Sequence, residues 1–258
     1  MPRAIDLRGS ADQFLRMSLS QTDPTQDELR LRLQGEWLTP LCEGGLWWER
    51  QRVLIVSDLH LEKGSSYAAR GQMLPPYDTC ATLTCVEALC TQLKPDTIIS
   101  LGDSFHDPRA ELRLPSAYAD RIRALTASHD WVWVEGNHDP DPPAHLGGRA
   151  AKTLHIGPLV FRHEPSGETG EIAGHLHPAA KVRGRGRAVR RRCFATDGAR
   201  LIMPAMGAFT GGLNVMDKAF ASVFPDGCMA FALAAGCVRA VPASALVPDG
   251  PRAGVWRL

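Results

Sequence analysis

The sequence predicts an α/β fold in which two mixed β-sheets form a sandwich flanked by helices. Short β-type runs alternate with helical patterns through the first half of the chain, the order expected of a parallel sheet. After His129 the pattern changes to closely spaced β-type runs, typical of a mostly β second half. A chain of 258 residues is long enough for one large domain with a substantial core.

Residues 1–27 are polar and aperiodic, so we expect a flexible N-terminal extension, followed by a single domain over residues 28–258. The first strand-like segment runs from Leu31 to Leu38. Apolar runs rich in β-branched and aromatic residues then predict three buried strands, Val53–Val56, Thr97–Leu101 and Trp131–Val134.

Two amphipathic helices are predicted between these strands. The first begins at Asp78, placed as its N-cap, and continues with leucine and valine at spacings of three and four. The second begins at Pro115-Ser116 and has Tyr118, Ile122 and Leu125 along one face. The resulting β-α-β-α-β order favours a parallel arrangement of the three strands.

Five further strands are predicted in the second half of the chain. They are Leu159–Arg162, Glu171–Ala173, Arg190–Ala195, Arg200–Met203 and Ala219–Phe224.

The composition limits the classes of function. Hydrophobic residues make up 44% and charged residues 22%, and the net charge is +1, so the overall balance indicates neither nucleic-acid nor membrane binding. Apolar runs fall short of the roughly eighteen residues that span a bilayer, and the chain opens without a secretory signal pattern. We therefore expect a cytoplasmic protein without membrane association. Seven cysteines without a C-x-x-C pair exclude a wholly disulfide-bonded scaffold.

Five of the predicted strands are followed immediately by side chains that can bind metals. In chain order, the polar residues in these positions are Asp58, His60, Asp103, Asn137, His138, Asp139, His163, His175 and His177. Residues just past the carboxyl ends of several strands can converge on one point. Carboxylate, imidazole and amide donors without thiolate suit Mn, Fe or Zn in a catalytic site, and two metals fit the number of ligands.

The pattern D-x-H, G-D, G-N-H-[DE], a lone His and G-H-x-H resembles the calcineurin-like metallophosphoesterase superfamily. Residues 53–215 are also similar to the bacterial ligase-associated DNA damage response endonucleases called PdeM. The segments SDLHLEKGSSYAARGQMLPPYDT, LGDSFHDP and GAFTGGLNV carry this closer similarity. The resemblance implies a β-sandwich of two mixed sheets with metals at the C-terminal ends of strands.

The resemblance also implies two groups of metal ligands joined by a bridging carboxylate. One group is Asp58, His60 and His177, the other is Asn137, His163 and His175, and the bridge is Asp103. His138 would be a general acid that binds no metal, and Asp139 would orient or charge-stabilise its imidazole. Mn is the expected metal, with Fe or Zn as alternatives.

Such a site predicts a two-metal-dependent phosphodiesterase. Two cations about 3.5 to 4 Å apart would clamp the phosphoryl oxygens and activate a water as hydroxide for in-line attack. His138 would then protonate the leaving oxygen, which departs poorly as an alkoxide.

A basic segment follows the G-H-L-H motif. Besides Lys181 it contains the predicted nucleic-acid-binding residues Arg183, Arg185, Arg187, Arg190, Arg191 and Arg192. A basic arm beside the metals suits a polyanion held through its phosphates, independently of base sequence. The alternative interpretation is a solvated basic hairpin.

Three classes of function stay open. They are a DNA endonuclease, a phosphomonoesterase or phosphodiesterase acting on nucleotides or other small phosphate esters, and a metal-free scaffold such as the retromer subunit of this fold. The intact ligand set argues against the scaffold, and the basic arm favours the nuclease. The resemblance implies DNA as substrate, single-stranded or with unpaired regions. It also implies a setting in DNA repair beside an ATP-dependent ligase, a helicase and an exonuclease.

Overall fold

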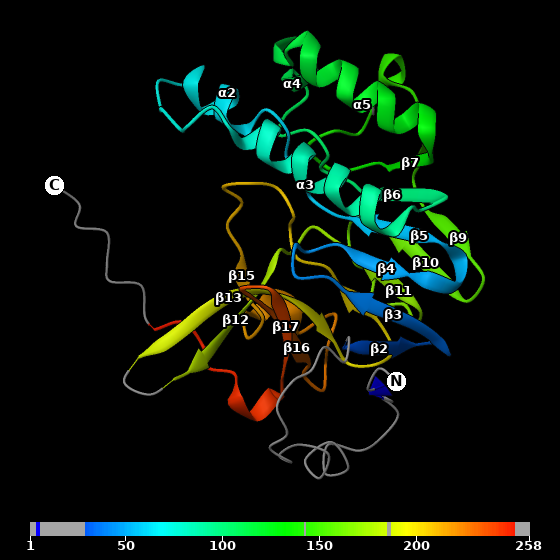
Figure 1. The fold of residues 1–258 in the computed structure, drawn as a ribbon. Helices are drawn as coiled ribbons and strands as arrows, with labels where there is room; N and C mark the ends of the chain where they lie inside the picture. The colour runs from blue at the N-terminus through cyan, green and yellow to red at the C-terminus, as the bar shows by residue number, and fades with distance from the viewer. Residues whose placement is uncertain (1–3, 6–28, 142, 185–186, 251–258) are drawn as a thin grey trace, which may run out of the picture.

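The computed structural model describes residues 4–5, 29–141, 143–184 and 187–250. Within them the chain forms two mixed β-sheets, with the longer helices along one side of the first sheet (Figure 1). This arrangement confirms the predicted sandwich of two mixed sheets flanked by helices.

In the first sheet each strand pairs with its neighbours in sequence. Its described strands are β1 (Ala4–Ile5), β2 (Arg30–Leu33), β3 (Glu36–Pro40), β4 (Leu46–Trp48), β5 (Val53–Val56), β6 (Thr97–Leu101), β7 (Asp130–Val134) and β8 (Arg149–Ala151). β5, β6 and β7 are parallel, with Val56 opposite Ser100 and Leu101 opposite Val134, as predicted. Their carboxyl ends therefore finish along one edge of the sheet.

The second sheet follows the order β15-β12-β13-β14-β11-β10-β9, with β16 paired to β13 and β17 to β16. Its described strands are β9 (Leu154–Ile156), β10 (Leu159–Arg162), β11 (Glu171–Ala173), β12 (Pro178–Arg183), β13 (Ala188–Thr196), β14 (Leu201–Ile202), β15 (Leu213–Asn214), β16 (Met229–Ala234) and β17 (Cys237–Val241). β10 and β11 are parallel, so their carboxyl ends also lie together.

Helices form the outer layer on the first sheet. They are α2 (Lys63–Ala68), α3 (Asp78–Leu93), α4 (Ala110–Arg113) and α5 (Ser116–Ser128), with short 3-10 turns at η1 (Glu49–Gln51), η2 (Ala144–Leu146), η3 (Lys218–Phe220) and η4 (Ala243–Ala245). α3 and α5 bury Val86 and Ile122 against Leu54 of β5 and Trp131 of β7. None of the described helices is both long and apolar enough to cross a membrane.

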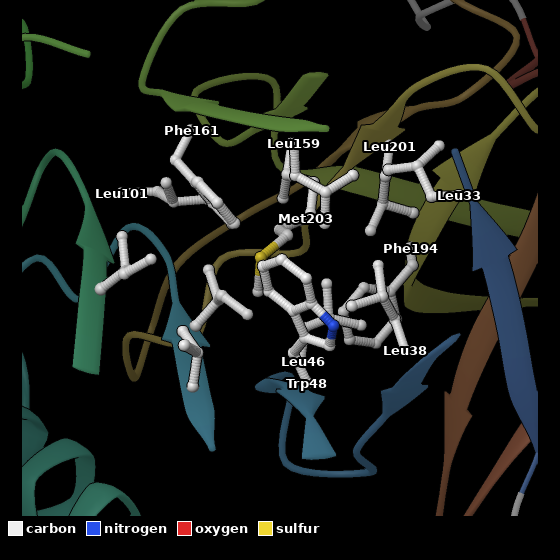
Figure 2. Packing of buried hydrophobic residues seen from close by; sticks show 14 of the residues in the cluster. Leu33, Leu38, Leu46, Trp48, Leu101, Leu159, Phe161, Phe194, Leu201 and Met203 are labelled. Carbon is white, nitrogen blue, oxygen red and sulfur yellow. The ribbon is translucent and has the colours of Figure 1, made fainter. Parts of the chain in front are cut away.

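Alternate residues of the central strands pack into different layers, as the two-residue period of a strand requires. Leu54 of β5 faces the helices, whereas Ile55 packs between the two sheets. There Trp48 lies close to Phe161 from the second sheet, with ring centroids 6.4 Å apart, and Phe194 fills the same layer (Figure 2). The first sheet is therefore packed on both faces, by the helices on one side and the second sheet on the other, and it supports the loops at the carboxyl ends of its strands.

Two predictions about the early part of the chain need correction. The segment from Leu31 to Leu38 is a hairpin of β2 and β3 rather than one strand, because Gln34 and Gly35 adopt positive φ angles of 49° and 90°. Asp78 is the first residue of α3 rather than its N-cap, and its carboxylate accepts a 2.9 Å hydrogen bond from the backbone N–H of Gly64. Asp78 thus joins α3 to α2.

The predicted strand Ala219–Phe224 is also wrong. This segment begins within η3 and continues as a turn. Phe220 and Phe224 are four residues apart and stack with ring centroids 6.4 Å apart, both buried against the outer face of the second sheet. A helical spacing of apolar residues was therefore mistaken for a strand.

The predicted N-terminal extension is described only at β1, which pairs in parallel with β2. Residues 6–27 lie outside the described residues, so the division of the chain at residue 28 stays a prediction. The seven cysteines are all described and all free, consistent with the exclusion of a disulfide scaffold.

Candidate metal centre

The loops after five strands bring the predicted ligands together. Two groups of donor atoms, each within 4.8 Å of one another, occur in the described part of the chain: Asp58, His60 and His177, and Asp103, His163 and His175. These residues follow the parallel strands β5 and β6 of the first sheet and β10 and β11 of the second, so the site forms where the loops after these strands in the two sheets meet.

The first group is compact, with Asp58 and His60 buried and His177 partly exposed. His177 Nε2 lies 3.1 Å from Asp58 Oδ1 and 3.3 Å from His60 Nε2. Ser57 Oγ donates to Asp58 Oδ2 at 2.5 Å, and the backbone N–H of His175 donates to the same oxygen at 3.2 Å. These bonds orient Asp58 so that Oδ1 faces the two imidazoles.

The second group includes the predicted amide ligand. Asn137 Oδ1 lies 2.9 Å from both His163 Nε2 and His175 Nδ1. His163 Nε2 is 3.4 Å from Asp103 Oδ1, whereas Asp103 Oδ2 is 3.9 Å from His60 Nε2 in the first group. One oxygen of Asp103 therefore faces each group, the position that a bridging ligand occupies.

The donor set fits divalent transition metals. Each group offers two imidazole nitrogens and a carboxylate oxygen, and the second adds an amide oxygen. Positive φ angles occur at five of the donors, at 51°, 43°, 46°, 66° and 44° for Asp58, His60, Asp103, His175 and His177. Such angles are uncommon outside glycine and cluster at functional sites, where the surrounding structure enforces them.

Glycines allow the ligand loops to approach one another closely. A Cβ on Gly102, whose φ is 71°, would lie 2.5 Å from the ring of His163. A Cβ on Gly136 would lie 2.2 Å from the backbone nitrogen of Asp103. The glycines of the G-D and G-N-H-D motifs are therefore required by the packing of the centre itself.

The carboxylates of the centre hold His163 in its charged form. Its Nδ1 faces the carbonyl of Leu101 at 2.9 Å while Nε2 faces Asn137 and Asp103, so both nitrogens donate. Burial opposes this charge, but Asp103 and Asp58 outweigh it and raise the pKa of His163 to about 9. Burial likewise opposes ionisation of Asp103, whose pKa is nevertheless lowered to about 2 by His163 and His138.

We therefore expect metal binding at pH 7 to release about one proton from His163, because a cation at Nε2 replaces that proton. The proton competes with metal below the raised pKa of about 9, so affinity should increase with pH up to that value and then level off. Calorimetric titration with Mn²⁺ in buffers of different ionisation enthalpy counts the protons released. A titration at pH 7 without proton release would contradict this assignment.

The ring of His138 is oriented by a backbone carbonyl rather than by Asp139. Its Nδ1 lies 2.8 Å from the carbonyl oxygen of His106, and its Nε2 lies 3.9 Å from Asp103 Oδ2. Asp139 Oδ2 accepts from the backbone N–H groups of Ser104 and Phe105 at 2.8 and 3.1 Å, and its alternative role, charge stabilisation of the His138 imidazole, stays a prediction. Asp139 instead shapes the loop after β6.

His106 was missed at the level of sequence, although it lies three residues after Asp103 in the same loop. Its ring stacks on His138 at 5.6 Å with an interplanar angle of 16° and meets His60 edge-on at 5.4 Å. Burial and the charge of nearby Lys63 lower the pKa of His106 to about 4. The pattern G-D-x-x-H was the available signal in the sequence. The next residue, Asp107, pairs with Arg113 at 2.6 Å.

The basic segment forms the hairpin of β12 and β13, which extends away from the rest of the fold (Figure 1). Arg183 and Arg187 are exposed near its tip, and Arg185 lies outside the described residues. Arg191 is exposed as well, but it projects from the opposite face to Arg183, because residues alternate along a strand. The hairpin therefore presents positive charge on both faces.

Two arginines of this segment turn toward the loop between β14 and β15. Arg190 Nη2 donates to the carbonyl of Gly212 at 2.7 Å, and its guanidinium also pairs with Asp249 at 3.4 Å. Arg192 Nη1 donates to the carbonyl of Ala205 at 2.7 Å, and burial lowers its pKa. Arg192 is thus engaged by the fold, whereas 43% of the Arg190 side chain stays exposed.

Comparisons with known proteins agree with this geometry. A family model described as Calcineurin-like phosphoesterase matches residues 51–190. The solved structure of the Pseudomonas putida nuclease MPE is 29% identical, with a TM-score of 0.65 over 82% of this chain and 98% of that chain. The structure of Yfce, a phosphoesterase from E. coli, is 16% identical, with a TM-score of 0.40 over 74% of this chain and 98% of that chain. A comparison with curated proteins found no match.

The matched span covers more than half of the chain and contains every predicted ligand, from Asp58 to His177. With two groups of histidine and carboxylate donors at the carboxyl edge of its strands, the chain belongs to the calcineurin-like phosphoesterase family, whose members hydrolyse phosphate esters with bound metals.

Proposed function

We propose that the protein is a two-metal phosphodiesterase that hydrolyses DNA phosphodiester bonds as an endonuclease. The observation that carries this proposal is the position of Asp103, whose two oxygens face separate groups of metal donors 3.4 and 3.9 Å away. When bound, two divalent cations, Mn in this proposal, would stabilise charge on the phosphoryl oxygens and lower the pKa of a water.

In this proposal His138 protonates the leaving oxygen. The bond from its Nδ1 to the carbonyl of His106 leaves Nε2 as the nitrogen that faces the centre. Its side chain is 42% exposed, compared with 4% for His60 and 3% for His163, so substrate can reach it. A charged ring donates through Nε2 while keeping the bond at Nδ1, which maintains its orientation during transfer.

Two observations support nucleic acid as the substrate. The chain resembles the Pseudomonas putida nuclease MPE over 82% of its length. Exposed arginines on the β12–β13 hairpin, which begins directly after His177, can follow a phosphate backbone, as positively charged grooves do in single-strand-binding proteins. DNA with single-stranded or unpaired regions is the proposed substrate. Repair in the cytoplasm beside a ligase, a helicase and an exonuclease is the proposed setting.

The direct test is to assay the purified protein with Mn²⁺ on single-stranded, duplex and circular DNA, on RNA, and on small phosphate monoesters and diesters. Cleavage of circular single-stranded DNA is expected, since a circle has no end for an exonuclease. Hydrolysis confined to small esters would replace the proposal with a phosphatase or phosphodiesterase acting on nucleotides. Fe²⁺ and Zn²⁺ should be tested in the same series.

The hairpin gives a separate prediction. We expect Arg183→Ala with Arg187→Ala to weaken single-strand binding and to flatten its log-log salt dependence by about 1.4, or about 0.7 for each phosphate that the hairpin no longer neutralises. Hydrolysis of a small diester should stay unchanged, because the metal ligands are untouched. Binding is measured by fluorescence anisotropy at several salt concentrations.

The matched control removes the same charge elsewhere. Arg50, within η1, and Arg52, directly after it, are exposed and pair with Glu36 and Asp96. Replacing both with alanine changes the net charge equally but should leave the salt slope at its wild-type value. If both double variants had the same salt slope, the hairpin would be a solvated basic surface without a specific role in DNA binding.

A further inference from the structure

The loop between β14 and β15, residues 203–212, borders the metal centre. The backbone N–H of Gly207 donates to the carbonyl of Asp58 at 3.1 Å, and the N–H of Leu213, just past the other end, donates to the carbonyl of His177 at 2.9 Å. Asp58 and His177 belong to the same group of donors. The middle of the loop and its C-terminal end are thus held by residues that would hold one metal.

The loop lies directly against the backbone of the ligand segments. A Cβ on Gly207 would come within 2.2 Å of the carbonyl oxygen of Leu59, and a Cβ on Gly212 within 2.7 Å of that of His177. Ala208 is fixed in turn on α3, where its N–H donates to Thr82 Oγ1 at 3.1 Å. These contacts fix the backbone of the loop relative to the ligand segments, so a side chain at its tip has a defined position.

The tip presents Phe209. Two residues of chain span at most about 7 Å, so the Cα of Phe209 lies no farther than that from Gly207. Its φ is 58°, an angle that a bulky side chain rarely adopts, and the residue is 49% exposed. Single exposed hydrophobic residues are common. Phe209 differs because it combines a strained backbone angle and an exposed side chain with a position two residues from Gly207, which bonds to the backbone of Asp58.

A cation flanks the other end of the same loop. The guanidinium of Arg190 donates to the carbonyl of Gly212 and pairs with Asp249 at 3.4 Å, and 43% of its side chain remains exposed to compete for a phosphate. The segment between Gly207 and Leu213, which contacts Asp58 and His177, therefore contains an exposed aromatic residue, Phe209, and has a guanidinium bonded near its C-terminal end. Proteins that bind single-stranded nucleic acid combine these two features, with the charge on phosphates and the ring stacked on a base.

We propose that Phe209 stacks on a nucleobase next to the scissile phosphate, with Arg190 on a neighbouring phosphate. This inference rests on the proposed function and assigns its substrate a base-stacking subsite. Every base has a π-face, so the contact tolerates any sequence but requires an unpaired base. Phe209 thus favours single-stranded or locally unpaired DNA over a closed duplex.

The test compares Phe209→Ala, Phe209→Leu and Phe209→Trp in the Mn²⁺-loaded protein. Binding of a phosphorothioate-linked single-stranded oligonucleotide, which resists cleavage, is followed by fluorescence anisotropy. Alanine and leucine should weaken binding about tenfold, whereas tryptophan should match or exceed the wild type. Leucine keeps the apolar bulk and the backbone angle, so a packing role for Phe209 would be rescued by it.

A cleavage assay locates the stacked base. A single abasic residue is moved along a single-stranded substrate, and kcat and KM are measured for the wild type and Phe209→Ala. At one position the missing base should raise KM about tenfold in the wild type and have little effect in the variant, because the partner is already absent. The kcat at saturating DNA should stay within about twofold.

The outcomes separate this inference from the proposed function. If the wild type cleaves single-stranded DNA and all three variants bind it equally, stacking is overturned and the nuclease stands. If the wild type binds DNA without cleaving it, the nuclease is overturned while the binding series still decides on Phe209. A wild type that neither binds nor cleaves DNA would overturn both.

Discussion

Asp103→Ala is expected to lower phosphodiester hydrolysis by about a thousandfold or more. The carboxylate faces both groups of donors, so its loss should release the metals or displace them. The several kcal/mol by which the metals stabilise the transition state would then be lost. Asp103 Oδ1 also accepts the backbone N–H of His138 at 2.9 Å, so the alanine variant loosens the general acid as well.

Asp103→Asn separates these two effects. An amide oxygen can still accept the N–H of His138 but lacks the charge that holds the cations. Elemental analysis should find reduced metal in both variants, and both should be inactive. Asp107→Ala, four residues along the same loop and paired with Arg113, is the matched control and should keep its metals. Full metal content and a nearly unchanged rate in Asp103→Ala would exclude a bridging role.

His138→Ala should reduce DNA cleavage by about 10² to 10⁴, the usual contribution of a general acid, with metal content unchanged. The loss should depend on the leaving group. A sugar alkoxide needs a proton to depart, whereas p-nitrophenolate leaves without one, so hydrolysis of a p-nitrophenyl diester should fall by less than about tenfold. Comparing kcat on the two substrates measures the difference.

His155→Ala serves as the matched histidine control, because His155 is exposed on β9 and belongs to neither group of donors. It should leave both rates unchanged. Equal losses on both substrates in His138→Ala would mean that His138 holds a metal or supports the loop. If that variant also retained its metals, His138 would support the structure of the loop and would not be a metal ligand.

Local pattern predicted the strands that carry the site. β5, β6, β10 and β11 have the predicted bounds, because each is a short, mainly apolar run followed at once by serine, glycine or histidine. The prediction failed where the same spacing of apolar residues is compatible with both a strand and a helical turn. Phe220 and Phe224 satisfy a helical turn as well as a strand, and only burial against the second sheet favours the turn.

The contacts within the site could not be predicted from local pattern. The carbonyl of His106, which orients His138 from 32 residues away, carries no side-chain signal. The sequence also gives no local signal that distinguishes the arginines of the basic segment from one another. Pairing of β12 with β13 separates Arg183 from Arg191, and the adjoining loop engages Arg190 and Arg192.

The sequence by itself determined the fold class, the family and the identity of the candidate ligands, because each depends on residue types within a few positions of a strand end. Tertiary structure decided which donors meet, since Asp58 and His175 are 117 residues apart and make contact only once the loop after β5 in the first sheet packs against the loop after β11 in the second. It also decided the exposure of Phe209, because its loop is held by backbone bonds to Asp58 and His177 that no local pattern encodes.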